Sequence, residues 1–300
     1  MVNDAIGVVI VTYDSRQEIG DCLDRLARAT DGYHLDTVVV DNGSNDGTLD
    51  FLRERHPEVH AIASRNLGYA HGCNLGVRGM LESGQEYVAI LFLNPDASLP
   101  TGGIDRLMAV LDAVPDAGGV SPHDVITLDK AYRPKTLFGA PMPGLTWPGR
   151  EISVSDRLHG SCMLFRPEVF RKIGFLDEGY FLYWEELDFG LRAQAAGYKL
   201  LICHDVTLHH RCDRPERAHR IYYMWRNQIR FARKNFPLGP RIRFWSRRAL
   251  SQLKELVGFL VSNRLDLAQA AIAGLFAGLR GETGKSQNRH AMPPGVARPK

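Results

Sequence analysis

Three short groups of acidic and amide side chains could bind a ligand or move a proton. They occupy residues 41–46 (DNGSND), 94–96 (NPD) and 185–188 (EELD). Carboxylate and amide oxygens are hard ligands that suit Mg²⁺ or Mn²⁺ and accept hydrogen bonds from a nucleotide. Either of the first two groups alone is equally typical of a turn, because Gly, Asn and Pro favour turns.

The third group is chemically the most unusual. Three carboxylates within four residues repel one another unless a cation or a shared proton offsets them. Phe181, Tyr183 and Trp184 precede the group directly. A carboxyl beside bulky apolar groups loses solvation, so its pKa rises toward the range useful for a general base. The alternative is an acidic helix start, which the helix dipole favours.

Alternating strands and helices are expected to position the first two groups. Buried, β-branched runs predict strands at 6–11, 37–40, 59–63 and 87–93, and helical periodicity predicts helices at 18–29, 48–55, 70–81 and 102–114. This alternation indicates βαβ units and a mostly parallel sheet. Ligands bind such sheets beyond the carboxyl ends of the strands, which is where residues 41–46 and 94–96 fall.

The second half of the chain is less regular. Residues 128–157 are rich in Pro and Gly and predict a long surface loop. The elements expected beyond it are helices at 167–173 and 185–196, short strands at 200–203 and 206–208, an apolar helical stripe at 245–260 and a second apolar helix at 270–279. We therefore predict a catalytic domain at 1–235, a helical extension at 236–281 and a disordered tail at 282–300. Within the catalytic domain, residues 1–120 are expected to bind the donor and residues 150–235 the acceptor.

Composition narrows the class of protein. With 300 residues, 44% hydrophobic and 24% charged, the chain is ordinary globular material that builds a normal core. Five cysteines without a C-x-x-C pair indicate a reducing compartment and argue against a disulfide framework or a zinc site. No apolar run reaches the roughly 18 residues of a membrane span, and the N-terminus does not read as a signal peptide, so we expect a cytoplasmic protein.

Charge is distributed unevenly along the chain. Residues 211–248 carry twelve Lys and Arg against Asp213 and Glu216, in a chain of net charge +3. An anionic partner and a solvated helix face are both open readings of this segment. Together with the apolar stripe that follows, it favours peripheral binding to the anionic inner face of the membrane. Packing of these helices on the catalytic domain or in a homodimer is the alternative.

Six motifs in order carry a resemblance to a known family. They are VVIVTYDS, VVVDNGSNDGT, NLGYAHGCNLG, LFLNPD, HGSCMLFRPEVFRKIGFLDEGYF and WEELDFGLR, spread over roughly Ile6 to Arg233. Their order resembles the family 2 glycosyltransferases of GT-A fold, especially the rhamnosyltransferase-like branch. The resemblance implies a GT-A (Rossmann-like) α/β fold with a mostly parallel sheet flanked by helices, and a C-terminal helical extension.

The resemblance also implies an activity and its substrates. The expected enzyme is an inverting, metal-dependent hexosyltransferase of cell-wall or surface-polysaccharide synthesis, with rhamnose as one candidate sugar. Its donor would be a dTDP- or UDP-linked sugar, and its acceptor a glycan or a polyprenyl-diphosphate-linked hydroxyl.

Matching positions supply the expected donor site. Thr12 and Tyr13 match the wall of the nucleotide pocket, and Asp41 matches the carboxylate that accepts from the base or the ribose. Asn66 and Asn74 lie in the motif that lines the donor site.

The expected metal site departs from the family pattern at one position. Asp96 matches the metal-ligating acid of the family's D-x-D motif, whereas the first acid of that motif is Asn94 here. A downstream histidine often completes the site in this family, and His209 matches it, with His210 as the alternative. The ion would be Mg²⁺ or Mn²⁺.

The acidic pair of the family falls on Glu185 and Glu186. Glu186 matches the general base, although Glu185 or Asp188 could take this role because the pair is Glu-Glu rather than Glu-Asp. Gly160 matches a loop near the acceptor.

Two other classes of protein compete with this interpretation. A nucleotidyltransferase-like, sugar-activating enzyme would need a glycine-rich, basic loop after the first strand, where residues 12–15 read TYDS. A nucleic-acid-binding protein could use the aromatic and basic side chains of residues 211–248. The acidic groups would repel a phosphate backbone, so no nucleic-acid partner is expected.

Overall fold

The computed structural model describes most of the chain and divides it into two compact units. The described residues are 4–124, 144–147, 150–210 and 217–291. The first unit comprises Met1–Leu176 and Phe189–Cys212, and the second comprises Asp177–Asp188 and Asp213–Lys300.

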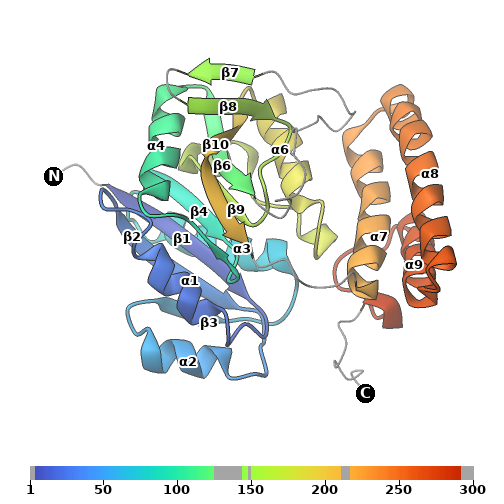
Figure 1. Cartoon of the computed structure of the whole chain (residues 1–300), viewed down its shortest axis with the longest axis horizontal. Coiled ribbons are helices and arrows are strands. Elements are labelled where there is room, and N and C mark those ends of the chain that lie inside the picture. Colours follow the sequence, from blue (N-terminus) through green and yellow to red (C-terminus); the bar gives the residue numbers. More distant parts are fainter. Residues whose placement is uncertain (1–3, 125–143, 148–149, 211–216, 292–300) are drawn as a thin grey trace. The chain divides into compact units, whose positions relative to one another are not determined.

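The first unit is built on one large sheet (Figure 1). Its strands are β1 (Ala5–Thr12), β2 (His34–Asp41), β3 (His60–Ala63), β4 (Ala89–Leu93), β5 (Ala97–Ser98), β6 (Ala117–Asp124), β7 (Gly144–Trp147), β8 (Arg150–Ser155), β9 (Cys162–Phe165) and β10 (Lys199–His210). The order is β3-β2-β1-β4-β9-β6-β10-β8-β7, and β5 pairs with β10 off this path. Most strands run in one direction, whereas β5, β8 and β9 run the other way. The predicted α/β class and mostly parallel sheet are confirmed.

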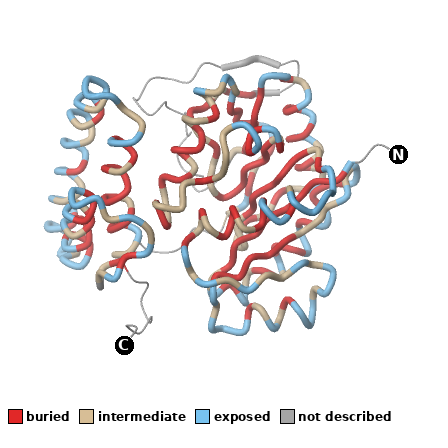
Figure 2. The backbone as a smooth tube through the Cα atoms, turned by 180° about the vertical axis from the view of Figure 1, so that it is seen from behind, coloured by how far each residue is buried: buried red, intermediate tan, exposed pale blue. Residues whose placement is uncertain are grey.

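Helices cover both faces of this sheet. They are α1 (Ile19–Leu26), α2 (Thr48–Arg55), α3 (Tyr69–Glu82), α4 (Gly103–Ala113), α5 (Pro167–Ile173) and the part of α6 (Glu185–Ala195) that follows Asp188. Alternate residues of β1 enter opposite cores, because successive side chains of a strand point to opposite faces. Ile10 packs with α1, α2 and α4, while Val9 packs with α3, α5 and α6. Figure 2 shows the strands between them as buried.

The strand order creates a binding crevice. From β1 the chain passes to β2 and β3 on one side and returns to β4 on the other. The carboxyl ends of strands flanking such a switch point leave a crevice in which ligands bind. Thr12 ends β1, Asp41 ends β2, and Asn94 directly follows β4. All three therefore belong to the edge that the sequence predicted.

The prediction of a long loop at 128–157 is wrong in part. Within it, β7 and β8 form a hairpin, and β8 pairs with β10. Its Pro and Gly content hid these edge strands, which depend on pairing with a distant strand. Residues 125–143 and 148–149 lie outside the described residues.

Strand prediction beyond residue 114 was incomplete. The two short strands expected at 200–203 and 206–208 are one strand, β10, with an irregularity between Cys203 and Thr207. The strands β6 and β9 were not predicted. They lie at the centre of the sheet. The four apolar residues of β9 are too few to show a period, and β6 reads AGGVSPHD, in which Gly, Ser and Pro interrupt any apolar pattern.

The second unit is helical. Its helices are α7 (Ala218–Asn235), α8 (Leu238–Val261) and α9 (Leu265–Arg280), with short 3₁₀ turns at Glu178–Tyr180 and Arg289–Ala291. The α7 and α9 helices pack closely, because a Cβ atom added at Gly274 would lie 2.3 Å from the Tyr222 carbonyl oxygen. The structure therefore groups α7 with the other helices of the second unit. The sequence instead predicted that the catalytic domain ends at residue 235, after α7.

Part of the predicted tail is ordered. The Ser286 N–H donates to the Tyr223 hydroxyl at 3.0 Å, and the Ser286 and Tyr222 hydroxyls lie 2.7 Å apart. Residues 292–300 lie outside the described residues.

Candidate active site

Asp41 is the centre of a hydrogen-bonded cluster at the ends of β1 and β2. Its side chain is buried, and Oδ1 accepts from the Thr12 hydroxyl at 3.0 Å and from the Ser44 hydroxyl. Oδ2 accepts from the Ser44 N–H at 3.0 Å. A carboxylate offers about four lone-pair positions, so one remains on Oδ2 for a ligand N–H or O–H. Asp41 is therefore both a structural anchor and a competent acceptor.

The loops after β1 and β2 are tied to each other around this cluster. The Asn45 N–H donates to Asp14 Oδ1, and the Asp14 N–H donates to Ser44 Oγ, both at 2.8 Å. Burial and the negative charge of Asp14 raise the pKa of Tyr13, while a side-chain hydrogen bond with Asn66 opposes that shift. The structure thus brings Tyr13 and Asn66 together, as expected for two walls of one pocket.

Asn74 has a clear structural role. Its Nδ2 donates to the Leu176 carbonyl at 2.9 Å, and its Oδ1 accepts the Leu176 N–H at 3.0 Å. This buried amide fastens α3 to the segment after α5. The expected contact of Asn74 with a donor stays a prediction beside this structural role.

Gly160 lies on a loop that is held close to the end of β4. The Tyr69 hydroxyl donates to the Gly160 carbonyl at 2.9 Å, and the Asn94 N–H donates to the neighbouring Ser161 carbonyl at 2.9 Å. The motifs around Asn94 and Gly160 are therefore adjacent in the fold, although they are far apart in the sequence.

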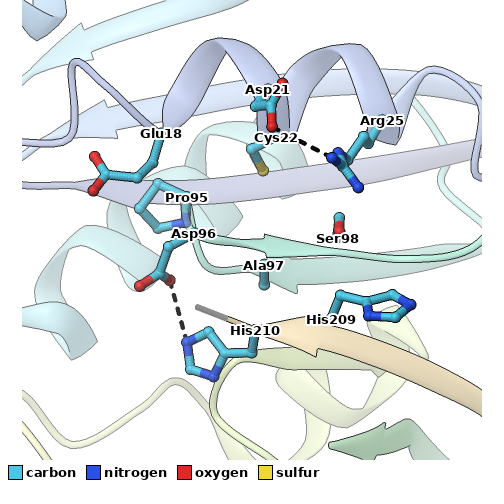
Figure 3. Close-up of a pocket in the computed structure, with 10 residues that line it drawn as sticks. All are labelled: Glu18, Asp21, Cys22, Arg25, Pro95, Asp96, Ala97, Ser98, His209 and His210. Atoms are coloured by element: carbon cyan, nitrogen blue, oxygen red, sulfur yellow. Dashed lines mark hydrogen bonds and ion pairs between the residues drawn. The ribbon is translucent and has the colours of Figure 1, made fainter. Parts of the chain in front are cut away.

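Asp96 meets a histidine of β10. His210 Nε2 lies 3.2 Å from Asp96 Oδ1 and 3.5 Å from Asn94 Nδ2. Pairing of β5 with the end of β10 sets Ala97 opposite His210 and Ser98 opposite His209. Figure 3 shows the His210 ring turned toward Asp96 and the His209 ring turned away from it. Of the two candidates left open by the sequence, His210 is the one that contacts Asp96.

A cavity of about 430 Å³ opens beside Asp96 (Figure 3). Its lining includes Glu18, Cys22 and Arg25 of α1 and its entry, together with His209 and His210. Burial and the charges of Asp96 and Asp21 raise the pKa of the Cys22 thiol to about 12. Cys22 is consequently a neutral thiol rather than a thiolate ligand.

A hard divalent cation suits the Asp96–His210 pair. The described residues contain no cluster of three or more His, Cys, Asp or Glu side chains able to hold a metal ion. Mg²⁺-type ions are commonly held by one or two carboxylates together with substrate phosphates. The pair fits a site that a bound diphosphate would complete.

The acidic cluster at the start of α6 belongs to the second unit. Asp188 is fully buried, and it accepts from Lys234 Nζ at 2.8 Å, from Asn235 Nδ2 at 2.9 Å and from the Tyr180 hydroxyl at 3.1 Å. These bonds fasten the segment to α7. Asp188 is thus an anchor, which makes it the weakest of the three candidates for a general base.

Glu185 and Glu186 differ in their surroundings. Glu185 is buried, and burial together with the charge of Glu186 raises the pKa of the Glu185 carboxyl well above its ordinary value. Among the described residues, its Oε2 atom has no hydrogen-bond partner. Glu186 is half-buried and can reach a ligand. Glu185 is therefore the acid whose pKa is raised, and Glu186 is the acid that a ligand can reach.

Two residues beside Asp41 were not singled out from the sequence. Ser44 donates two hydrogen bonds to the Asp41 carboxylate. Asn42 has a buried Oδ1 without a hydrogen-bond partner among the described residues. The spacing Asp-x-x-Ser in a glycine-rich turn could have indicated the Ser44 contact, because Asp side chains commonly accept from backbone N–H groups a few residues on.

The fold and this site define a glycosyltransferase of GT-A type. The Glycosyl transferase family 2 model matches residues 7–174, more than half of the chain, and the chain belongs to that family.

Three relatives with assigned activities match most of the chain. The low-salt glycan biosynthesis hexosyltransferase Agl10 of Haloferax volcanii is 28% identical over 95% of this chain and 94% of its own. The N-acetylglucosaminyl-diphospho-decaprenol L-rhamnosyltransferase of Mycobacterium tuberculosis is 29% identical, over 70% of this chain and 77% of its own. The dTDP-rhamnosyl transferase RfbF of Shigella flexneri is 27% identical over 94% of this chain and 98% of its own.

Solved structures show the same fold at low identity. A Pyrobaculum calidifontis mannosyltransferase, in complex with GDP-Man and Mn²⁺, superposes with a TM-score of 0.62 at 16% identity, covering 91% of this chain and 86% of that one. The S. aureus TarS fragment 1–349 in complex with UDP-GlcNAc has a TM-score of 0.52 at 15% identity, with 92% of each chain covered. These likenesses support the GT-A fold. Among the described helices, none is both long and apolar enough to cross a membrane.

Proposed function

We propose that the chain transfers a hexose from a nucleotide-diphosphate donor to a hydroxyl of a polyprenyl-diphosphate-linked glycan, inverting the anomeric carbon. L-Rhamnose carried on dTDP is the first candidate donor, since two of the relatives are named as rhamnosyltransferases and one of these names dTDP-rhamnose chemistry. The acceptor class follows the decaprenol-linked substrate in the name of the mycobacterial relative. Cell-surface glycan synthesis is the process in which such a step belongs.

The arrangement of Asp41, Asp96 and His210 carries this proposal. Asp41 keeps one lone pair for the base or ribose of the donor, and Thr12 and Ser44 hold its carboxylate in place. Asp96 and His210 would hold a divalent cation, Mg²⁺ or Mn²⁺, against the diphosphate. When bound, such an ion stabilises the negative charge that develops on the leaving diphosphate.

Glu186 is the proposed general base. An acceptor hydroxyl is a weak nucleophile until a positioned carboxylate takes its proton during attack. Glu186 is the accessible member of the cluster, whereas Glu185 is buried and Asp188 is bound to Lys234 and Asn235. One base and one direction of attack give inversion without a covalent sugar–enzyme intermediate.

The helical unit is proposed to bind the inner face of the membrane, where a polyprenyl-linked acceptor presents its head group. The apolar stripe predicted at 245–260 lies on α8 and is exposed at Leu250, Leu253, Val257 and Leu260. Arg243 and Lys254 are exposed on the same helix. Apolar area and cations on one helix suit the boundary of an anionic bilayer.

The test is sugar transfer by the full chain with Glu186→Gln. The assay supplies dTDP-rhamnose, UDP-hexoses or GDP-mannose, Mg²⁺ or Mn²⁺, and a polyprenyl-diphosphate-linked sugar. We expect kcat to fall by about 10²-fold or more while donor affinity stays nearly unchanged, because only proton removal is lost. Glu82→Gln is the matched control, since Glu82 is exposed at the end of α3. Near-normal turnover by Glu186→Gln would contradict the assignment of the base.

A further inference from the structure

The segment just before the acidic cluster has an unusual backbone. Phe181, Tyr183 and Trp184 have φ angles of 68°, 66° and 80°, in the left-handed region that residues other than glycine avoid. Such a residue is strained and persists only where its surroundings over-determine its conformation. The segment 180–184 therefore needs strong partners, and it leads directly into Glu185 and Glu186.

Asn227 of α7 provides most of those partners. Its Nδ2 donates to the carbonyl oxygens of Tyr180 at 2.9 Å, Leu182 at 2.7 Å and Tyr183 at 2.9 Å. The Asn227 side chain is fully buried. The two N–H bonds of one amide group thus serve three carbonyls of one strained turn, so two of the carbonyls share an N–H. Loss of this amide would remove a donor from the Leu182 and Tyr183 carbonyls, whereas the Tyr180 carbonyl also accepts from Arg226.

Arg226 fixes the orientation of that amide. Its Nε donates to Asn227 Oδ1 at 2.8 Å, so the NH₂ group of Asn227 must face the carbonyls. Its Nη2 donates to the Tyr180 carbonyl at 2.7 Å, and its Nη1 donates to the Gly284 carbonyl at 2.6 Å. A buried guanidinium is costly unless its donors find partners, and these bonds pair three of its five N–H donors with acceptors.

Two further contacts hold the ends of the turn. The Gly284 N–H donates to the Gly179 carbonyl at 2.8 Å, and the indole Nε1 of Trp184 donates to the Met224 carbonyl at 3.1 Å. The turn is thus fastened along its length, and Asn227 and Arg226 contact its middle.

We propose that Asn227 and Arg226 are positioning residues for the acidic pair: they hold the turn 180–184 in its strained form and so fix where α6 begins. This inference rests on the proposed role of Glu186 as the base. If the turn relaxed, the first residues of α6 would shift, and the Glu186 carboxylate would move with them. A displacement of about 1 Å at a catalytic group can cost about 10²-fold in rate.

The experiment compares Asn227→Asp with Gln228→Glu in the full chain. Asn227→Asp keeps the size of the side chain but replaces its donating NH₂ group by an oxygen that repels the three carbonyls. Gln228→Glu is the same chemical change at the next buried residue of α7, where the amide meets the Trp225 carbonyl and Arg248 of α8. We expect Asn227→Asp to lower kcat by about 10²-fold with the KM for the donor unchanged, and Gln228→Glu to alter kcat little.

Two readouts separate positioning from a general loss of stability. The acidic limb of the pH profile of kcat/KM should move in Asn227→Asp, because a relaxed turn changes the surroundings of the acidic pair. Hydrogen exchange at the amides of residues 180–186 should rise in Asn227→Asp and not in Gln228→Glu. If Asn227→Asp is recovered unfolded, Asn227→Ser, which keeps one O–H donor, is measured in its place.

The outcomes also distinguish this inference from the proposed function. A folded Asn227 variant with the kcat, pH profile and hydrogen exchange of the parent overturns the positioning role. If Glu186→Gln is inactive in the same assay, the proposed base stands and only the positioning role fails. If Glu186→Gln is fully active, the assignment of the base fails, whatever the Asn227 variants do.

Discussion

At the scale of single residues, the contact between Asp96 and His210 decides a question that the sequence left open. His209 and His210 are consecutive on a strand, so their side chains leave opposite faces, and only one can meet a given carboxylate. The 3.2 Å separation identifies His210 as that residue.

Histidine substitutions test this choice. We expect His210→Ala to weaken metal-dependent donor binding by about 10–100-fold, as loss of a group that supports a bound metal commonly does. His209→Ala is the matched control and should bind as the parent does. Donor binding by each chain is titrated in the presence of Mn²⁺ or Mg²⁺. Sugar transfer is then measured in excess chelator, where it should stop. A larger effect of His209→Ala, or full transfer in chelator, would refute the assignment.

The raised pKa of Glu185 leads to a second prediction at this scale, which concerns how protein stability depends on pH. Its pKa is raised in the folded protein by burial and by Glu186. The folded state therefore binds this proton more tightly than the unfolded state, and stability falls as pH rises from the ordinary value of 4.5 through the raised pKa. We expect Glu185→Gln to raise Tm more at neutral pH than at pH 4 in thermal unfolding scans. An equal change in Tm at both values would argue against a raised pKa.

At the scale of elements, the helical unit depends on the close approach of α7 and α9. Gly274 and Gly278 face the backbone of α7, where an added Cβ would lie 2.3 Å from the Tyr222 carbonyl oxygen and 2.7 Å from that of Arg226. Glycine is needed here for space rather than for backbone freedom, since both residues lie within a regular helix.

A pair of glycine substitutions tests this packing. Gly274→Ala should destabilise the protein by about 1–3 kcal/mol, because backbone on the facing helix cannot move aside easily. Gly258→Ala in α8 is the control, since nothing lies within 4 Å of its added Cβ. That change should stabilise by about 0.5–1 kcal/mol, because glycine disfavours helix interiors. Denaturant unfolding compares both variants with the parent, and equal effects would show that the α7–α9 contact is not tight.

At the scale of the whole molecule, several basic residues of the segment 211–248 make contacts within the helical unit. Arg230 and Lys234 pair with Asp177, Arg226 is buried, and Arg248 contacts Gln228. Much of the positive charge expected to meet an anionic partner is therefore used within the helical unit. The exposed apolar residues of α8 and α9 consequently carry more of the membrane proposal than the charge does, with Val261 as much as 82% exposed.

Vesicle flotation tests the membrane proposal. The full chain should float with vesicles containing anionic lipid at low ionic strength and bind less at high salt, since screened charges attract less. The variant Leu253→Ser with Val257→Ser should float less, because it removes exposed apolar area from α8. Ser246→Ala, an exposed change on the same helix, is the control. A parent chain that stays in solution with these vesicles and sediments as a dimer would assign the apolar surface to a second copy instead.

Much of the first half of the fold could be predicted from local sequence. The helix at 48–55 has the predicted bounds, and the strands β1, β2 and β4 include most of the residues expected, because buried β-branched runs and helical periodicity are local signals. The groups at 41–46 and 94–96 also fell at the predicted edge of the sheet, since each lies at the end of a strand. The strands β6, β8 and β9 could not be predicted, because each depends on pairing with strands far away in the sequence.

By itself, the sequence determined the α/β class, the alternation of strands and helices up to residue 114 apart from the short strand β5, and the motifs that mark a glycosyltransferase. Only the tertiary structure decided which histidine meets Asp96, since Asp96 and His210 come from segments far apart in the sequence. It likewise revealed that Asn227 holds a turn more than 40 residues earlier in the chain. Local periodicity follows from the backbone of one segment, whereas these hydrogen bonds exist only after distant segments have packed together.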